Sequence, residues 1–458
     1  MNALLLSGIL GVIMMFGGIM LKSKAAVRNL ALAGMGLLLI VNILEMSGTV
    51  LFKIDTKGMM AFDSFALLFN SIAFFSAFIY LLLSARDIEK VGINYAEYLA
   101  LIFFILCGIT LISSYKSLLI LFIGIEIVSI PLYILTGSDK RNLKSNEASL
   151  KYFLLGTFST GLMLMGIALI YGAIGSFDTS VIGAFTEAKP SALLIGGMLL
   201  LLFSMAFKAS VAPFHFWTPD VYDGAPTVFT SFMATIVKAA VFIAFIRLFD
   251  ESFGFRQQQW QFFIGILTVA TLFIGNITAV FQQSVKRMLA YSSIAQAGFM
   301  MLSLYSMNTD AKEGLLLYTV AYTFTTIGIF AVLIKMKDYT FDGFNGFAKQ
   351  QPVLAATTTI FILSLAGIPL TAGFISKFYM LKATMADGKN LWLVIFAVLM
   401  AAVSVYYYFR IIQAMYFKEG EPQPIEVTPA FKWTLVVLAA LVLLLGIFPN
   451  LLLNWYYF

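Results

Sequence analysis

Long apolar runs separated by short polar loops make up nearly the whole chain. Because a helix needs about 20 apolar residues to cross the hydrocarbon core of a bilayer, each run of this length predicts one membrane span. The first run is followed at once by a second, so we expect a retained helix and not a cleaved signal. The pattern predicts an all-α polytopic membrane protein with 14 transmembrane helices, at residues 3–21, 27–46, 62–84, 96–114, 117–136, 149–173, 192–217, 226–249, 260–282, 285–305, 313–336, 353–383, 391–417 and 431–449.

Two of these runs are expected to be broken at a proline. Pro213 lies in the seventh run and Pro369 lies in the twelfth. Proline has no backbone N–H, and its ring clashes with the carbonyl four residues earlier. We therefore expect two broken helices, with freed carbonyls at Ala209 and Leu365.

The two broken helices occupy matching places along the chain. Each is the fourth member of a group of five spans, helices 4–8 and helices 9–13, and interrupted segments in matching positions indicate inverted repeats. We expect four regions: helices 1–3 at residues 1–95, the first five-helix repeat at 96–249, the second, inverted repeat at 260–417, and the last helix at 431–458.

Composition excludes a globular enzyme. Of the 458 residues, 61% are hydrophobic and 11% are charged, whereas soluble domains carry about 25% charged residues. Cys107 and His215 are the only cysteine and histidine, so the chain by itself cannot assemble an iron–sulfur cluster, a zinc site or a disulfide framework. Any redox chemistry must then belong to partner proteins.

The basic residues predict the orientation in the membrane. Loops that follow odd-numbered spans carry 16 lysines and arginines, and the opposite loops carry 9. By the positive-inside rule the first set is cytoplasmic, which places both termini outside. The net charge of +6 is explained by these topology signals, and it does not indicate nucleic-acid binding.

Five charged residues lie away from the loops. They are Lys151, Lys208, Lys238, Lys377 and Glu126. On insertion scales each such charge costs about 2.5–3.5 kcal/mol, so these side chains must face protein or water. Burial and pairing change the proton affinity of a charged group in opposite directions, so moving a neighbour can switch it. A buried glutamate with several lysines therefore predicts a proton pathway.

Simpler interpretations exist for some of these residues. Glu126 and Lys208 could form a static ion pair that ties two helices together, but no second and third deep acid exists to pair with Lys238 and Lys377. Lys151 lies near a span end, where an interfacial anchor is an equal alternative to a role in transport.

The segment after the first break has its own alternatives. His215 is either a locally satisfied helix-end histidine or a proton relay, since its reference pKa of about 6.5 suits that task. Asp220 and Asp223 flank the turn that follows. For these two acids, solvated turn residues or helix caps are favoured over a site of proton uptake.

Four stretches of the chain resemble a known family. EASLKYFLLGTFSTGLMLMGIALIYG at 147–172, KASVAPFHFWTPDVYDGAPT at 208–227, VKRMLAYSSIAQAGFM at 285–300 and LAGIPLTAGFISKFYML at 365–381 closely resemble the N subunits of bacterial proton-pumping NADH:quinone oxidoreductase, respiratory complex I. The chain departs from the family at two positions. Val228 stands where the family often has a second proline after GAPT, and Met165 stands where it often has an aromatic residue, and neither position is charged. The resemblance implies a translocase subunit with fourteen helices and two inverted five-helix repeats.

The resemblance also implies the site, the cofactors and the partners. The proton-translocating residues of this family fall on Glu126, Lys208, Lys238, Lys377, His215 and Lys151. NADH, FMN, iron–sulfur clusters and quinone would reside in partner subunits, with no cofactor in this chain. The partners would be neighbouring antiporter-like and small membrane subunits in the lipid bilayer of the bacterial inner membrane. Protons would move from the cytoplasm to the outside, driven by quinone reduction elsewhere in the complex.

Three rival hypotheses fit many of the same features. A subunit of a multisubunit sodium/proton antiporter would share the fold and exchange cations without NADH or quinone. A membrane scaffold would use the buried charges only to specify helix packing. A related redox complex would receive electrons from a donor other than NADH, because other subunits select the donor.

Overall fold

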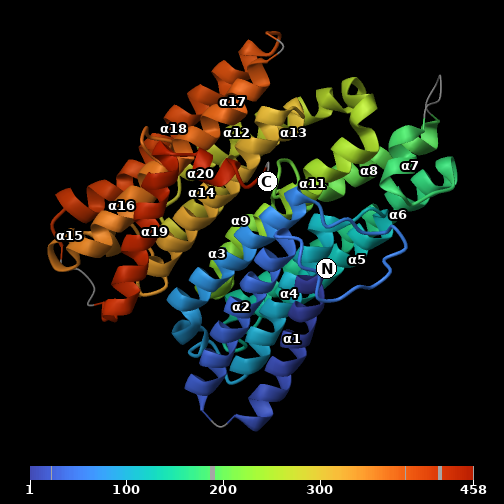
Figure 1. The fold of residues 1–458 in the computed structure, drawn as a ribbon. Coiled ribbons are helices and arrows are strands. Elements are labelled where there is room, and N and C mark those ends of the chain that lie inside the picture. Colours follow the sequence, from blue (N-terminus) through green and yellow to red (C-terminus); the bar gives the residue numbers. More distant parts are fainter. Residues whose placement is uncertain (22, 186–190, 387, 421–424, 457–458) are drawn as a thin grey trace.

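The computed structural model describes residues 1–458 except 22, 186–190, 387, 421–424 and 457–458 (Figure 1). Its regular elements in this described part are helices, with isolated β-bridges but no strand. The helices are α1 (Asn2–Met20), α2 (Lys24–Met46), α3 (Ser64–Ile88), α4 (Tyr95–Ser114), α5 (Leu118–Thr136), α6 (Leu143–Ile174), α7 (Thr179–Ala184), α8 (Ala192–Lys208), α9 (Trp217–Gly224), α10 (Thr227–Phe232), the π-helix η1 (Met233–Val237), α11 (Lys238–Phe253), η2 (Gly254–Arg256), α12 (Gln257–Val280), α13 (Val285–Ser306), α14 (Thr309–Leu333), η3 (Asp342–Phe344), α15 (Phe347–Gln350), α16 (Pro352–Ala366), α17 (Ala372–Met385), α18 (Leu391–Phe417), α19 (Pro429–Ile447) and α20 (Asn450–Leu453).

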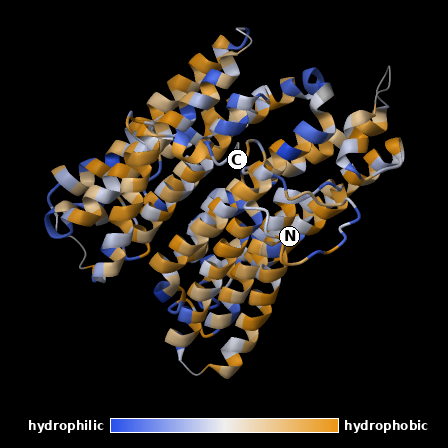
Figure 2. Cartoon of the chain, in the orientation of Figure 1, coloured by the Kyte–Doolittle hydropathy of each residue, from blue (hydrophilic) through white to orange (hydrophobic). Residues whose placement is uncertain are grey.

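The predicted polytopic membrane protein is confirmed at this level. Within the described residues, 11 helical segments are long and apolar enough to cross a membrane: α1 to α6, the continuous segment α10–η1–α11, α12, α14, α18 and α19. Figure 2 shows hydrophobic residues over most of their length. Two of the other three predicted runs correspond to the split pairs α8/α9 and α16/α17. The third corresponds to α13, a continuous helix whose sequence contains polar residues such as Lys286, Arg287 and Gln296.

The helices form two groups that meet along central helices. In Figure 1 the N-terminal helices lie on one side and the C-terminal helices lie on the other. In the first group α4 packs against α1 and α5, and α6 packs against α8; in the second, α12 packs against α13 and α18, and α14 packs against α16 and α17. Contacts of α14 with α3 and of α13 with α9 join the groups.

The helices at this junction are fully enclosed. All residues from 227 to 249 and from 314 to 333 are buried. In contrast, α19 buries only residues on one face, including Phe431, Leu435 and Leu438. The last long helix is thus peripheral, and Lys238 lies inside one of the two fully buried segments.

Small residues allow close contact between α6 and α8. A Cβ atom on Gly166 would lie 2.9 Å from the Gly197 carbonyl oxygen, and a Cβ atom on Gly197 would lie 2.8 Å from the Gly166 carbonyl oxygen. Any larger residue at either position would push the two backbones apart. The pair holds α8, and with it Lys208, against the neighbouring span.

Both chain ends lie near the segment that leads from α2 into α3. The Asn2 side-chain oxygen accepts a hydrogen bond from the backbone N–H of Leu51 at 3.1 Å. The rings of Phe65 and Tyr456 are 6.0 Å apart. The two termini therefore share one side of the molecule.

Candidate functional site

The first predicted helix break is confirmed. Helix α8 ends at Lys208, and residues 209–216 form turns before α9 begins at Trp217. The break exposes carbonyls in the last turn of α8, and the indole N–H of Trp217 donates to the Phe207 carbonyl at 3.0 Å. Such local partners make a break inside a membrane tolerable.

Lys208 reaches across the break to α5. Its side chain is buried, and its ammonium donates to the Ser129 hydroxyl at 2.9 Å and lies 3.4 Å from the Tyr133 hydroxyl. Glu126 lies one turn before Ser129 on the same face of α5, because residues three apart on a helix are neighbours. The Glu126 carboxylate oxygen Oε1 is buried and has no hydrogen-bond partner. Among the described residues no ion pair joins Glu126 to Lys208, so the static ion pair is not formed.

Lys238 lies directly after the π-helical turn η1. Its side chain is 2% exposed, and its ammonium donates to the backbone carbonyl of Ser293 at 2.8 Å and to the Ser293 hydroxyl at 3.0 Å. A π-helical turn inserts an extra residue into a helix, and such turns are frequent at functional sites. The contact connects the central segment α10–η1–α11 to α13.

The second predicted break is also confirmed, together with its freed carbonyl. Helix α16 ends at Ala366 and α17 begins at Ala372. The Lys377 ammonium donates to the Leu365 carbonyl at 2.7 Å and lies 4.5 Å from the centre of the Phe299 ring. Lys377 is therefore held by the carbonyl that the interruption leaves without its helical partner.

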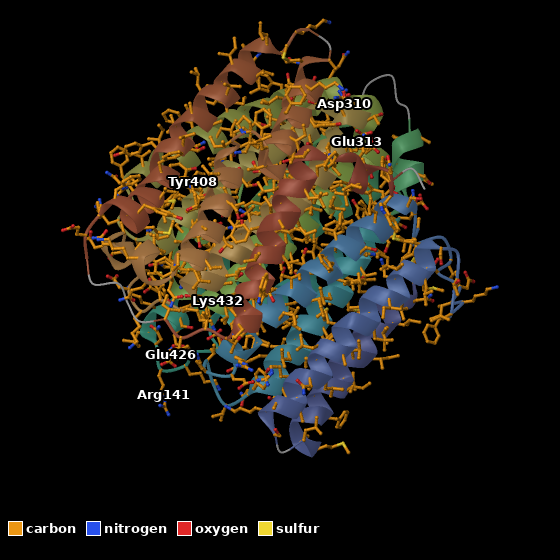
Figure 3. All side chains as sticks on the ribbon, turned by 60° about the vertical axis from the view of Figure 1, so that its left-hand side comes forward. Arg141, Asp310, Glu313, Tyr408, Glu426 and Lys432 are labelled. Atoms are coloured by element: carbon orange, nitrogen blue, oxygen red, sulfur yellow. The ribbon has the colours of Figure 1, made fainter. Side chains whose placement is uncertain are left out.

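Gln296 lies between the hydrogen-bond partners of Lys238 and those of Lys377. Its amide donates to the same Leu365 carbonyl at 3.0 Å and to the Tyr408 hydroxyl at 2.9 Å, and its oxygen accepts from Tyr318. Tyr408 is fully buried, and in Figure 3 it lies between the end that carries Asp310 and Glu313 and the end that carries Glu426 and Lys432. Gln296 follows Ser293 by one turn of α13, so the partners of Lys238 and Lys377 lie on adjacent turns of one helix.

Sequence reasoning did not identify Gln296 as functional. The available signal was a glutamine in the middle of a predicted span, in the stretch SSIAQAGF. Uncharged polar side chains in a span are common helix contacts, so the sequence offers no reason to select this one. Only the packing of α13 against α16, α17 and α18 shows what it touches.

Among the described residues, no hydrogen bond joins His215 or Lys151 to Lys208, Lys238 or Lys377. His215 is 5% exposed, its Nδ1 atom has no hydrogen-bond partner, and its ring stacks on Phe216 at 4.6 Å. Lys151 is 41% exposed and pairs with Glu147 at 2.7 Å and Asp220 at 2.8 Å. Lys151, Glu147 and Asp220 line a polar pocket of about 150 Å³, which agrees with the place of Lys151 near the end of a span.

Four lysines of the described residues are buried, and their partners are neutral oxygen atoms. One of them, Lys286 at the start of α13, donates to the Asp223 and Ala225 carbonyls at 2.8 Å and 2.7 Å. Lys208, Lys238 and Lys377 donate only to hydroxyl and carbonyl oxygens in the hydrogen bonds of the described residues. Near the surface, lysines pair with carboxylates, as in Lys312 with Asp250 at 2.6 Å. The described residues contain no group of three His, Cys, Asp or Glu side chains that could hold a metal ion.

Comparison with known proteins gives consistent matches. The family described as NADH:quinone oxidoreductase/Mrp antiporter, TM, matches residues 115–404. The NADH-quinone oxidoreductase subunit N of Cytophaga hutchinsonii is 42% identical over 404 residues, which cover 87% of each chain. A chain of respiratory complex I from Thermus thermophilus with bound aureothin has 32% identity and a TM-score of 0.85, covering 99% of this chain and 98% of its own.

A chain of an Mrp complex shares the fold at lower sequence identity. A chain of the Mrp complex from Dietzia sp. DQ12-45-1b has a TM-score of 0.86 but 17% identity, covering 99% of this chain and 96% of its own. At that identity the likeness concerns the fold alone. The identity to subunit N, together with the match over residues 115–404, shows that this chain belongs to the NADH-quinone oxidoreductase subunit N family.

Proposed function

We propose that this chain, a proton-translocating membrane subunit of NADH:quinone oxidoreductase, moves protons through Glu126, Lys208, Lys238 and Lys377. The observation that carries the pathway is that Lys208, Lys238 and Lys377 are buried and held by neutral oxygen atoms. A carboxylate partner favours the charged form of a lysine, whereas a hydroxyl or carbonyl partner favours it less. A lysine with neutral partners can therefore release its proton to a neighbour at a smaller cost.

Gln296 supports transfer between the last two lysines. Lys238 is hydrogen-bonded to Ser293, and Gln296 follows Ser293 by one turn of α13. Gln296 and Lys377 both donate to the Leu365 carbonyl. These groups surround a path from Lys238, at the start of α11, to the second helix break. Water molecules entering this polar region would complete the path, since it offers both donors and acceptors.

Glu126 is proposed as the switch. It lies one turn from the hydroxyl that holds Lys208, and its buried oxygen has no partner. A change of charge at the boundary with a neighbouring subunit would displace Glu126 and change the proton affinity of Lys208. We assign His215 and Lys151 to proton supply from the cytoplasmic side, because Lys151 lies at a polar pocket and His215 lies in the segment that follows Lys208.

The finer architecture belongs to the same proposal. We propose 14 transmembrane helices, with both termini outside, and two inverted repeats at residues 96–249 and 260–417, flanked by residues 1–95 and 431–458. NADH, FMN, iron–sulfur clusters and quinone would be bound by partner subunits. The neighbours would be antiporter-like and small membrane subunits of the bacterial inner membrane.

Replacement of Lys208 tests the proposal. In membrane vesicles that carry the assembled complex, Lys208→Ala should lower NADH:quinone turnover and proton pumping together, by roughly 100-fold for the loss of a group that transfers a proton. Proton uptake and NADH oxidation should be measured on the same preparation, with the amount of assembled complex determined in parallel. Turnover and pumping fall together because a blocked proton path stalls a tightly coupled machine.

The matched control is Lys382→Ala. Lys382 is 56% exposed and pairs with Asp310 at 3.0 Å, so its removal should leave both rates near wild type. If Lys208→Ala assembles and pumps with full stoichiometry, the buried lysine is a structural charge and the pathway is wrong. Cation exchange by this chain without NADH or quinone would instead support the antiporter hypothesis.

A further inference from the structure

A basic pocket lies between the N-terminal helices and the last long helix. It has a volume of about 350 Å³ and is lined by residues of α2, α3 and the beginning of α19. Figure 3 shows Glu426 and Lys432, which flank the start of α19, at the end of the molecule opposite to Asp310 and Glu313. The pocket therefore lies at the end of the spans that carries the predicted cytoplasmic loops.

Four cations line this pocket: Arg28, Arg86, Lys90 and Lys335. The one acid in the lining is Glu426, which is exposed. The lining therefore has a formal charge of 4 − 1 = +3. Two carboxylates behind the lining, Asp87 and Glu89, pair with three of the cations and hold them in place.

Arg86 is the exception among the four. It is exposed and makes no hydrogen bond or ion pair with another described residue. Counting Asp87 and Glu89 with the lining still leaves a net charge of +1, which is the charge of Arg86. The pocket thus presents one guanidinium whose donors are all available to an anion.

The other half of the pocket is apolar. Leu82 lies one turn before Arg86 on α3 and is 44% exposed, and Leu32 and Phe431 belong to the same lining. The Lys335 ammonium lies 5.1 Å from the centre of the Phe431 ring. The pocket therefore changes from cationic to apolar within one helical turn, in the direction of the membrane interior.

We propose that this pocket binds an anionic phospholipid. The phosphate group would bind Arg86, whose planar guanidinium matches phosphate oxygens in pairs, and an acyl chain would lie along Leu82. Basic pockets between membrane helices on the cytoplasmic side bind such headgroups. Free inorganic phosphate would use the same cations but not the apolar half. The lipid would bridge α3 and α19, and this role does not depend on the proton pathway.

Photolabelling of the intact complex tests the proposal. The purified complex is placed in nanodiscs that contain phosphatidylglycerol with a photoreactive acyl chain, and the labelled peptides are identified by mass spectrometry. We expect labelling of the peptides that contain Leu82 and Phe431. Arg86→Ala should lower this labelling about fivefold, because one basic residue near the surface contributes about 1 kcal/mol to the binding of anionic lipid.

Two further variants complete the design. Lys349→Ala removes an exposed cation of α15 that is outside the pocket lining, and it should leave the labelling unchanged. Leu82→Trp fills the apolar half without changing the charge. It should also lower the labelling, and it replaces Arg86→Ala as the test if that variant does not assemble.

Three results would overturn the proposal. Equal labelling by a photoreactive phosphatidylcholine would show that the negative charge is not recognised. Displacement of the lipid by inorganic phosphate would identify free phosphate as the ligand. Absence of label at this pocket in the wild-type complex would show that another subunit covers it.

Discussion

Gln296 shows how one uncharged residue can connect two ionisable ones. Its amide nitrogen has two acceptors, the Leu365 carbonyl and the Tyr408 hydroxyl, and its oxygen accepts from Tyr318. All of these groups are buried, and a buried amide with several partners holds a fixed orientation. Gln296 thereby positions the carbonyl on which the Lys377 ammonium rests.

Gln296→Leu is expected to slow proton transfer to Lys377. The substitution removes a hydrogen bond to the Leu365 carbonyl, worth about 1–1.5 kcal/mol, which corresponds to roughly a tenfold fall in coupled turnover. The measurement is NADH-driven proton pumping in vesicles with equal amounts of assembled complex.

Gln261→Leu is the matched control for this variant. Gln261, near the start of α12, also donates from its amide to a backbone carbonyl, that of Tyr305, at 3.0 Å. Tyr305 follows Gln296 on α13 by a rise of roughly 13 Å, so this bond does not touch the surroundings of Lys377. Replacement of Gln261 should leave pumping unchanged. Equal effects of the two substitutions would mean that Gln296 acts through stability alone.

The two broken helices use their interruptions differently. At the first, the Trp217 indole donates to the Phe207 carbonyl, which also accepts from the Ser210 backbone N–H, and Lys208 turns away to α5. At the second, Lys377 itself binds the freed carbonyl of Leu365. Gly367 makes the second break possible, because its φ of +84° is strained for any residue with a side chain.

Gly367→Ala should disturb Lys377 specifically. A Cβ atom at this position would lie 3.2 Å from Cδ and 3.5 Å from Nζ of Lys377, so the lysine would have to move away from the Leu365 carbonyl. We expect a loss of about 1–2 kcal/mol of stability from the backbone strain and, in addition, a marked loss of proton pumping.

Gly175→Ala separates the effect of backbone strain from the effect of displacing Lys377. Gly175 ends α6 with a φ of +78°, and a Cβ atom added there would have no neighbour within 4 Å. This variant should lose a similar amount of stability, seen as a lower melting temperature of the complex, and retain pumping. If both variants pump equally well, the position of Lys377 at the break is not critical.

At the scale of the whole molecule, Arg247 joins the N-terminal helices to the central segment. Its guanidinium pairs with Asp63 at 2.8 Å and Glu251 at 3.2 Å, and it donates to the Ser113 and Tyr115 carbonyls at 2.9 Å and 3.2 Å. The side chain is 3% exposed. These contacts fix the ends of α3 and α4 against α11, the helix that carries Lys238.

Arg247→Leu should weaken this junction. Its removal leaves the buried Ser113 and Tyr115 carbonyls without this donor, which costs about 1–3 kcal/mol for each group. The expected result is a lower melting temperature and less assembled complex in the membrane. Lys312→Ala, at the partly exposed pair with Asp250, should cost no more than about 1 kcal/mol. Equal stability of the two variants would contradict the assigned role of Arg247.

The sequence by itself determined the class of the protein, its two helix breaks and its family. Hydropathy marks spans because a bilayer excludes unsatisfied backbone groups, and a proline in a helix interior removes a backbone hydrogen bond, which favours a break of the kind seen near Pro213 and Pro369. The cost of a charge inside an apolar run is likewise sufficient to select Lys208, Lys238 and Lys377. These properties are local, so they can be derived from single segments of the chain.

Only the tertiary structure decided the partners of the charged groups. It placed Lys208 on Ser129 instead of Glu126, Lys377 on the Leu365 carbonyl, Gln296 between two lysines, and Lys151 in an exposed ion pair. A partner depends on how each helix is rotated and shifted against its neighbours. In a membrane this is set by packing of small and polar residues over whole helices, and an apolar run does not encode it.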